Sequence, residues 1–174
     1  MEFKNDQELI NSLEDTLVKE FRSLQTLVNI TKDERQALTS GDTDLIMRLV
    51  EEKEVLLDQL GLLEDTRRMH QDQLANRLKL PGMQSTVDLF SHLETESSQR
   101  LIRLTEGISA LGRQVRDLND WNKAYAASTL EWLDAAQAFL LKLLDTNTGY
   151  SSTGYPSTGS ITDTPISIQV SRKA

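Results

Sequence analysis

The chain has 174 residues, 38% of them hydrophobic, and its eight glycines, three prolines and nine aromatic residues favour one domain built from long helices. The formal net charge of −8 argues against the broad basic surface that nucleic acid binding requires. The chain has no cysteine and two histidines, which excludes disulfides and cysteine-based metal sites.

The first two predicted helices form a hairpin. Apolar residues recur at steps of three, four or seven from Ile10 to Leu27 and return at Leu38, which predicts an amphipathic helix over residues 5–39. A second leucine stripe predicts a helix over residues 43–79, before Pro81. Between them, Gly41 can end one helix in a left-handed conformation and Asp42 can cap the next. We therefore predict that the two helices form a tight antiparallel hairpin.

The third block, residues 86–144, has the most regular pattern in the chain. Two series of residues seven apart, the second displaced by three, match the a and d positions of a coiled-coil seam. The first series is Leu101, Ile108, Val115, Asn122, Thr129, Ala136 and Leu143, and the second is Leu104, Leu111, Leu118, Tyr125, Trp132 and Phe139. We therefore predict an all-α fold, an elongated antiparallel helical hairpin plus a long third helix in a three-helix bundle or coiled coil. Asn122 at an a position suggests a buried register-setting group, with a hydrogen bond to a partner as the alternative.

The composition changes abruptly at Thr146, because 12 of the last 29 residues are serine or threonine. Such a segment buries too little apolar surface to order itself, so we expect a helical domain over residues 1–145 and a flexible Ser/Thr/Gly-rich tail over residues 146–174. Apolar residues alternate with polar ones from Ile166 to Val170, and the role of that stretch is left open.

The predicted helices differ in length. At 1.5 Å per residue the first two are about 50 and 55 Å long and an unbroken third is about 85–90 Å long, so residues 124–144 overhang the hairpin. Of these 21 residues, 15 are apolar or aromatic. An exposed apolar stripe of this size indicates an interaction site, and we favour the helix of another protein as its cover. Folding back as a fourth helix and self-association remain the alternatives.

Other classes of function find little support in the sequence. The start of the chain, MEFKNDQELI, lacks the pattern of a signal peptide, and no apolar stretch could span a bilayer, so we expect a cytoplasmic protein without stable membrane insertion. No serine lies in a nucleophile elbow, no glycine-rich phosphate loop is present, and His70 and His92 lack a third ligand cluster. We expect neither enzyme activity nor a metal or other cofactor.

Several segments resemble one family of proteins. They are SGDTDLIMRLVEEKEVLLDQLGLLEDTRR at residues 40–68, DLNDWNKAYAASTLEWLDAAQAFLLKL at residues 117–143, and the tail with its repeated TGY. Together these segments resemble FlgN-type flagellar export chaperones over about residues 5–155. The resemblance implies a cytoplasmic type III secretion chaperone that binds hook–filament junction proteins, prevents their premature assembly and delivers them to the flagellar export apparatus.

The resemblance also implies two sets of site residues. Client binding falls on the carboxy-terminal part of the last helix, where the helix lengths also place an exposed stripe. The corresponding residues are Tyr125, Leu130, Trp132, Leu133, Ala136, Phe139, Leu140 and Leu143. A tyrosine after that helix, Tyr150 or Tyr155, is expected to dock on the cytosolic domain of the export gate. The alternative is a coiled-coil scaffold or self-associating adaptor without a secretion client, and a weak homodimer, the preferred client and the oligomeric state are left open.

Overall fold

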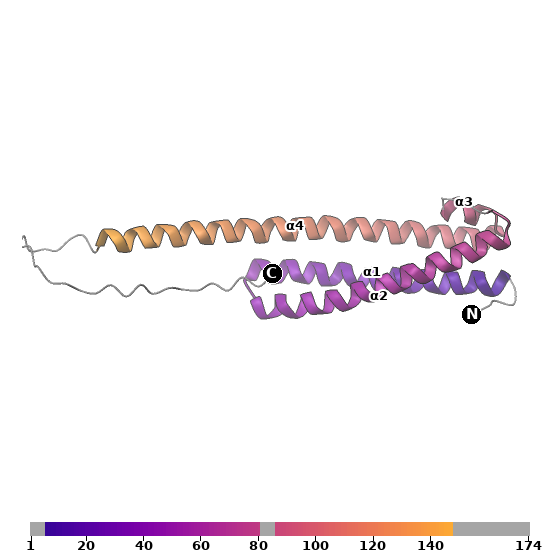
Figure 1. Ribbon diagram of the computed structural model, residues 1–174, viewed down its shortest axis with the longest axis horizontal. Coiled ribbons are helices and arrows are strands. Elements are labelled where there is room, and N and C mark those ends of the chain that lie inside the picture. Colours follow the sequence, from indigo (N-terminus) through magenta and orange to yellow (C-terminus); the bar gives the residue numbers. More distant parts are fainter. Residues whose placement is uncertain (1–5, 81–85, 148–174) are drawn as a thin grey trace, which may run out of the picture. The chain divides into compact units, whose positions relative to one another are not determined.

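The computed structural model describes residues 6–80 and 86–147, with side chains through residue 144 (Figure 1). The described residues form four helices and no strand: α1 (Asp6–Ser40), α2 (Thr43–Arg77), α3 (Thr86–Ser91) and α4 (Thr95–Asn147). The predicted all-α fold, with an antiparallel hairpin and a long further helix, is confirmed. The described chain divides into two units, the first ending at residue 131 and the second beginning at residue 132, and α4 belongs to both.

The turn between α1 and α2 contains two residues that satisfy both helix ends. Gly41 adopts the left-handed conformation with φ 72°, as predicted. Its N–H donates to the Leu38 carbonyl at 3.4 Å, and the Asp42 N–H donates to the Ala37 carbonyl at 3.0 Å, the pairing of a Schellman motif. The Asp42 carboxylate then accepts a hydrogen bond from the Leu45 N–H at 3.0 Å. Asp42 thus closes α1 and begins α2.

The carboxyl end of α2 uses the same motif without a glycine. The Leu80 N–H donates to the Ala75 carbonyl at 2.9 Å, and the Lys79 N–H donates to the Asn76 carbonyl at 3.2 Å. Lys79 takes the left-handed position, with φ 59°. The helix therefore ends at Arg77, two residues earlier than expected, before the chain reaches Pro81.

A break over residues 92–94 separates α3 from α4, where the sequence predicted one helix from residue 86. The side chains of Phe90 and Leu101 are both fully buried in one core cluster with residues of α1 and α2. In a continuous helix these two residues would lie about 16 Å apart along the axis. The break allows both to reach the same core.

Two apolar clusters hold the first unit together. The larger consists of Leu9, Ile10, Leu13, Leu17, Leu74, Leu89, Phe90 and Leu101. The smaller consists of Leu27, Val28 and Val115, with half-buried leucines from α1, α2 and α4 around it. Since later residues of α1 meet later residues of α4, these two helices run parallel in this unit.

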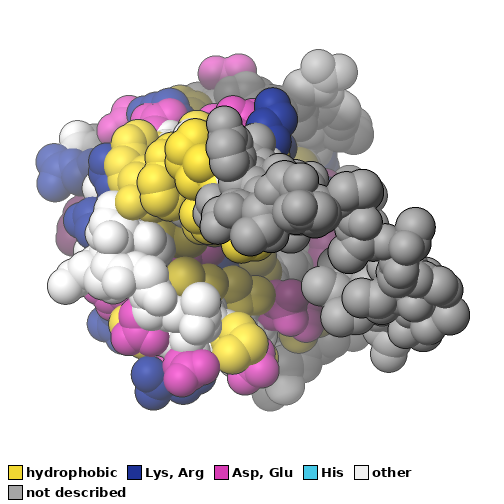
Figure 2. Space-filling view, turned by 90° about the vertical axis from the view of Figure 1, so that its left-hand side faces the viewer, with side chains coloured by type: hydrophobic (Ala, Val, Ile, Leu, Met, Phe, Trp, Pro, Cys, Tyr) yellow, Lys and Arg dark blue, Asp and Glu magenta, His cyan; other side chains and the backbone are white. Residues whose placement is uncertain are grey.

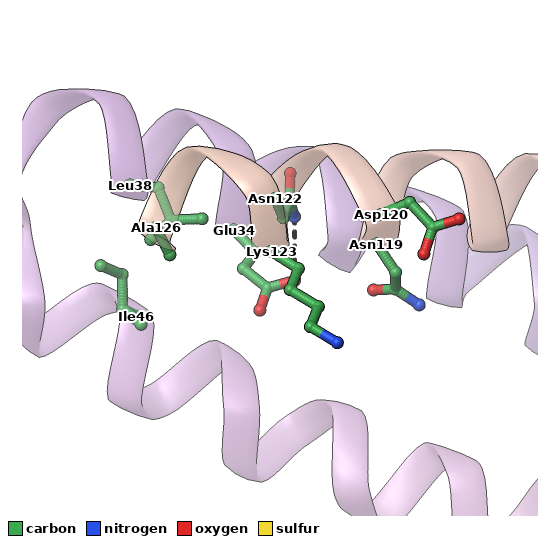
Figure 3. A pocket seen from close by; sticks show the side chains of 8 residues that line it. All are labelled: Glu34, Leu38, Ile46, Asn119, Asp120, Asn122, Lys123 and Ala126. Carbon is green, nitrogen blue, oxygen red and sulfur yellow. Dashed lines mark hydrogen bonds between the residues drawn. The ribbon is translucent and has the colours of Figure 1, made fainter. Parts of the chain in front are cut away.

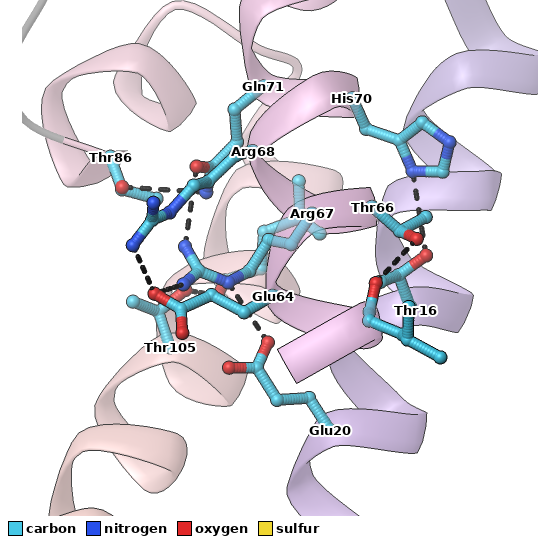
Figure 4. A network of polar contacts seen from close by, with 12 residues as sticks. Thr16, Glu20, Glu64, Thr66, Arg67, Arg68, His70, Gln71, Thr86 and Thr105 are labelled. Carbon is cyan, nitrogen blue, oxygen red and sulfur yellow. Dashed lines mark hydrogen bonds and ion pairs between the residues drawn. The ribbon is translucent and has the colours of Figure 1, made fainter. Parts of the chain in front are cut away.

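Polar side chains also lie between the helices of the first unit (Figure 4). The Arg67 Nε of α2 donates to Glu20 Oε2 of α1 at 2.9 Å, and Glu20 is only 6% exposed. Burial raises the pKa of Glu20, although the neighbouring Arg67 lowers it in part. His70, also buried, has Nδ1 3.5 Å from the Thr16 hydroxyl, and burial lowers the pKa of its imidazole.

Candidate protein-binding site

The side chains of the heptad seam predicted for the third block pass from buried to exposed along α4. Its first members are buried or half-buried, with Leu101 0%, Val115 8% and Asn122 5% exposed. From residue 129 onward the seam is exposed except at Ala136, which is half-buried, and Trp132 is 69% exposed. The repeat therefore continues after the burial has ended.

Within the second unit, one side of α4 collects six of the predicted client-binding residues, which we call the carboxy-terminal apolar face. They are Trp132, Leu133, Ala136, Phe139, Leu140 and Leu143. At about 100° per residue they occupy roughly a third of the helix circumference. The large side chains among them are 46–69% exposed. Figure 2, which looks at the molecule from the left-hand side of Figure 1, shows a group of hydrophobic side chains in its upper part and further hydrophobic side chains lower in the view.

The other two predicted client-binding residues belong to the first unit. Tyr125 is half-buried, and its ring stacks on Trp121 with centroids 5.2 Å apart and planes 13° apart. The Arg35 guanidinium lies 3.4 Å from the centre of the same Trp121 ring. Tyr125 therefore takes part in a stacked cation–π cluster. Leu130 is 63% exposed.

Asn122 occupies a buried polar layer near this cluster (Figure 3). Its Nδ2 donates to the Thr31 carbonyl and to Glu34 Oε2, both at 3.0 Å. Lys53 Nζ donates to the same Glu34 oxygen and to Asn119 Oδ1, both at 2.6 Å. These bonds join α1, α2 and α4, and Asn122 is buried among them, which fits a polar group at a buried position of the seam.

A hollow of about 440 Å³ opens beside this polar layer. It is lined by Glu34, Leu38, Ile46, Asn119, Asp120, Asn122, Lys123 and Ala126 (Figure 3). Asn122 Oδ1 is buried and has no hydrogen-bond partner among the described residues.

Two exposed leucines of the second unit are absent from the predicted set. Leu144, 64% exposed, lies beside the carboxy-terminal apolar face, and Leu141, 55% exposed, lies toward the opposite side of the helix. Both lie in the apolar run of residues 124–144, but neither is at a heptad position nor among the residues to which the family resemblance assigned client binding. The predicted docking residues Tyr150 and Tyr155 lie outside the described residues.

The described ranges also bear on other kinds of site. Over residues 6–80 and 86–147, no helix combines the length and apolarity that crossing a bilayer takes. In the same ranges no group of three or more histidine or acidic residues is arranged to hold a metal ion.

The fold and the exposed face together define an all-α helical bundle protein with an apolar helix surface open to solvent. The model of the FlgN protein family matches residues 1–158, and the chain belongs to this family. FlgN proteins are flagellar export chaperones rather than enzymes, and their clients are flagellar hook-associated proteins. No curated protein and no solved structure matches the chain.

Proposed function

We propose that this protein binds the amphipathic terminal helix of a hook–filament junction protein in the cytoplasm on the carboxy-terminal apolar face of α4. The client helix would lay its own apolar side against Trp132, Leu133, Phe139 and Leu140, the helix-in-groove mode of recognition. The exposure of these side chains, 50–69%, is the observation that carries the proposal. Patches of exposed apolar side chains of this kind mark interaction sites.

Covering the client terminus prevents assembly, because junction proteins assemble through those same segments. A terminus that folds as it binds spends part of the contact energy on its own ordering, which keeps the affinity moderate. Moderate affinity permits delivery of the client to the export apparatus without an energy-consuming step on the chaperone.

The test is calorimetric titration of purified hook-associated proteins into the full chain. Leu133→Asp together with Leu140→Asp places two charges in the contact, and we expect the dissociation constant to rise about a hundredfold or more. Both side chains are exposed, so the helical content by circular dichroism is expected to stay unchanged.

A matched control uses Met47→Asp together with Leu57→Asp, which are 59% and 48% exposed on α2 in the first unit. This variant adds the same charge and removes similar apolar surface, and it is expected to bind the client normally. Normal client binding by the Leu133/Leu140 variant, or an equal loss in both variants, would reject the proposed face.

We further propose that Tyr150 or Tyr155 docks on the cytosolic domain of the export gate. Support comes from the TGY sequence that surrounds each tyrosine within the family-matched residues. Changing both to alanine is expected to spare client binding and to weaken binding of the purified gate domain. A gate affinity unchanged by the double substitution would remove these tyrosines from the docking site.

The alternative function is a self-associating scaffold that uses the same apolar face. Sedimentation of the full chain at micromolar concentration separates the two proposals. A chaperone is expected to sediment as a monomer or weak homodimer and to form a complex with its client. A stable oligomer that Leu133→Asp and Leu140→Asp dissociate, without client binding, would favour the scaffold.

A further inference from the structure

A second apolar surface lies on α2, in the first unit. Val55, Leu62 and Met69 are 59%, 70% and 47% exposed. They are seven residues apart, so they form one line along the helix that drifts by only about 20° per repeat. We call these three residues the α2 apolar column. The helix needs none of them for its core, since its buried residues are Leu49, His70 and Leu74.

Acidic residues run beside this column with the same period. Asp44, Glu51, Asp58, Asp65 and Asp72 are also seven apart, and we call them the acidic column. All five are exposed, and none forms an ion pair with another residue of the described chain. By contrast, Glu64 on the same helix pairs with Arg67 and Arg68. The five carboxylates span about 42 Å and lie roughly 10.5 Å apart.

The two flanks of the α2 apolar column differ. A hollow of about 390 Å³ between α1 and α2 is lined by Lys19, Ser23, Gln59, Leu62, Leu63 and Thr66. At the level of Leu62, the flank toward the hollow is therefore neutral or basic and the other flank is acidic. At the start of α2, Arg48 continues the line in place of an apolar residue, so the apolar surface begins at Val55.

We propose that this face of α2 docks an amphipathic helix of another protein, with an apolar seam of seven-residue period and lysines or arginines along one flank. The seam would pack on the α2 apolar column as in a coiled coil, where flanking charges select the partner and its orientation. The basic flank would lie over the acidic column, where five exposed carboxylates, none of them in an ion pair, would speed association and set specificity. Its residues all belong to the first unit, so the surface is distinct from the carboxy-terminal apolar face of the second unit.

A second copy of the chain fits this surface poorly. Its basic helix segment carries Arg100, Arg103, Arg113 and Arg116 on α4. Their spacings of three, ten and three residues spread them over more than half of the helix circumference, not along one flank. Arg100 is already paired with Glu14 and Glu96. Because these arginines do not line one flank of a helix, a different protein is favoured as the partner of the acidic column.

The probe for a first test is a synthetic helical peptide of about 28 residues, which matches the length of the acidic column. It carries leucines at a seven-residue period and lysines on one flank, and a second peptide carries glutamates in place of the lysines. Fluorescence anisotropy with the full chain is expected to show binding of the lysine peptide only. Raising the salt from about 0.1 to 1 M, which shortens the screening length from about 10 to 3 Å, is expected to weaken it at least about tenfold.

Two sets of variants locate the peptide. Glu51→Lys, Asp58→Lys and Asp65→Lys together reverse the centre of the acidic column, and we expect at least about tenfold weaker binding. The control set, Asp15→Lys, Glu106→Lys and Asp117→Lys, makes the same change in net charge at exposed positions on α1 and α4 and is expected to change binding less than about twofold. Equal weakening by both sets would mean attraction to net charge alone and would overturn the proposal.

The apolar part has its own tests. Leu62→Ser is expected to weaken peptide binding, while Leu133→Ser with Leu140→Ser is expected to leave it unchanged. Loss of binding in the second variant would move the peptide to the carboxy-terminal apolar face and overturn the proposal. So would self-association of the full chain that the acidic-column variant abolishes, since a second copy would then occupy the surface. Hook-associated protein binding is expected to survive the acidic-column variant, which separates this inference from the proposed function.

Discussion

Gly107 of α4 lies directly against the ring of Phe21 of α1. A Cβ atom added at position 107 would be 2.7 Å from Phe21 Cε2 and 3.2 Å from Cδ2. Gly112, five residues later in the same helix, has no atom within 4 Å of the corresponding position apart from its own neighbours and the backbone of its own helix. Two glycines that look equivalent in the sequence therefore have different roles, and only the first allows close helix packing.

Alanine substitutions separate these roles. Gly112→Ala is expected to raise the free energy of unfolding by about 0.5–1 kcal/mol, because alanine is the better helix former. Gly107→Ala gains the same propensity but must displace the Phe21 ring, which costs about 1–3 kcal/mol. Urea denaturation should therefore find Gly107→Ala the less stable variant, and equal stabilities would contradict the close contact.

Lys79 offers a stabilising substitution. Its φ of 59° is strained for a residue with a Cβ, and glycine is the usual residue at this position of a Schellman motif. Lys79→Gly is expected to raise the free energy of unfolding by about 1 kcal/mol, measured by thermal or urea denaturation. Lys79→Ala keeps the strain and serves as the control. If alanine stabilised as much as glycine, the charge of Lys79 rather than its conformation would be the cause.

The Lys53–Glu34 pair is expected to couple α1 to α2 strongly. Both side chains are only 15% exposed, and Lys53 Nζ lies 2.6 Å from Glu34 Oε2. Lys53→Met leaves the Glu34 carboxylate without its cation and should lower the free energy of unfolding by about 1–3 kcal/mol. Adding Glu34→Gln should recover part of this loss. A double-mutant cycle measures the coupling, and strictly additive effects would mean that the pair contributes little.

Stability is expected to depend on the protonation of His70. Burial lowers the pKa of its imidazole below the ordinary value of 6.5, so the unfolded chain binds the proton more readily than the folded chain. Stability should therefore fall as the pH drops from 6.5 through the lowered pKa and should be complete above 6.5. His70→Asn is expected to flatten this part of the curve of unfolding free energy against pH. An identical slope in the variant would assign the dependence to other groups.

Local signals in the sequence predict the hairpin because its determinants are local. Gly41 and Asp42 specify a turn through their own conformations and side chains, and both act as predicted. The break at residues 92–94 has no such signal. It arises because Phe90 and Leu101 reach one core together with residues of α1 and α2, which is a property of the packed molecule. Lys79 in the left-handed position is likewise not predictable from residue preference.

In the candidate site, too, local sequence patterns predict one part of the structure and packing determines the rest. The seven-residue repeat predicts which side of the last helix is apolar, and the side chains from Trp132 to Leu143 are exposed there, apart from the half-buried Ala136. The repeat alone cannot show where burial stops. Tyr125 occupies a heptad position, but its ring stacks on Trp121. The Arg35 guanidinium covers the same Trp121 ring, and sequence spacing does not reveal this arrangement. The acidic column of α2 was present in the sequence, yet only exposure and the lack of ion pairs distinguish it from an ordinary charged face.

The double role of Asp42 limits how the hairpin can change in length. Because the residue that closes α1 also caps α2, the connection contains no spare residue. A single inserted residue would turn α2 by about 100° and carry Leu49 and Leu74 away from α1. Longer or shorter hairpins therefore require matched insertions or deletions of whole heptads in both helices. Sequence length in this part of the molecule is expected to vary in steps of about fourteen residues.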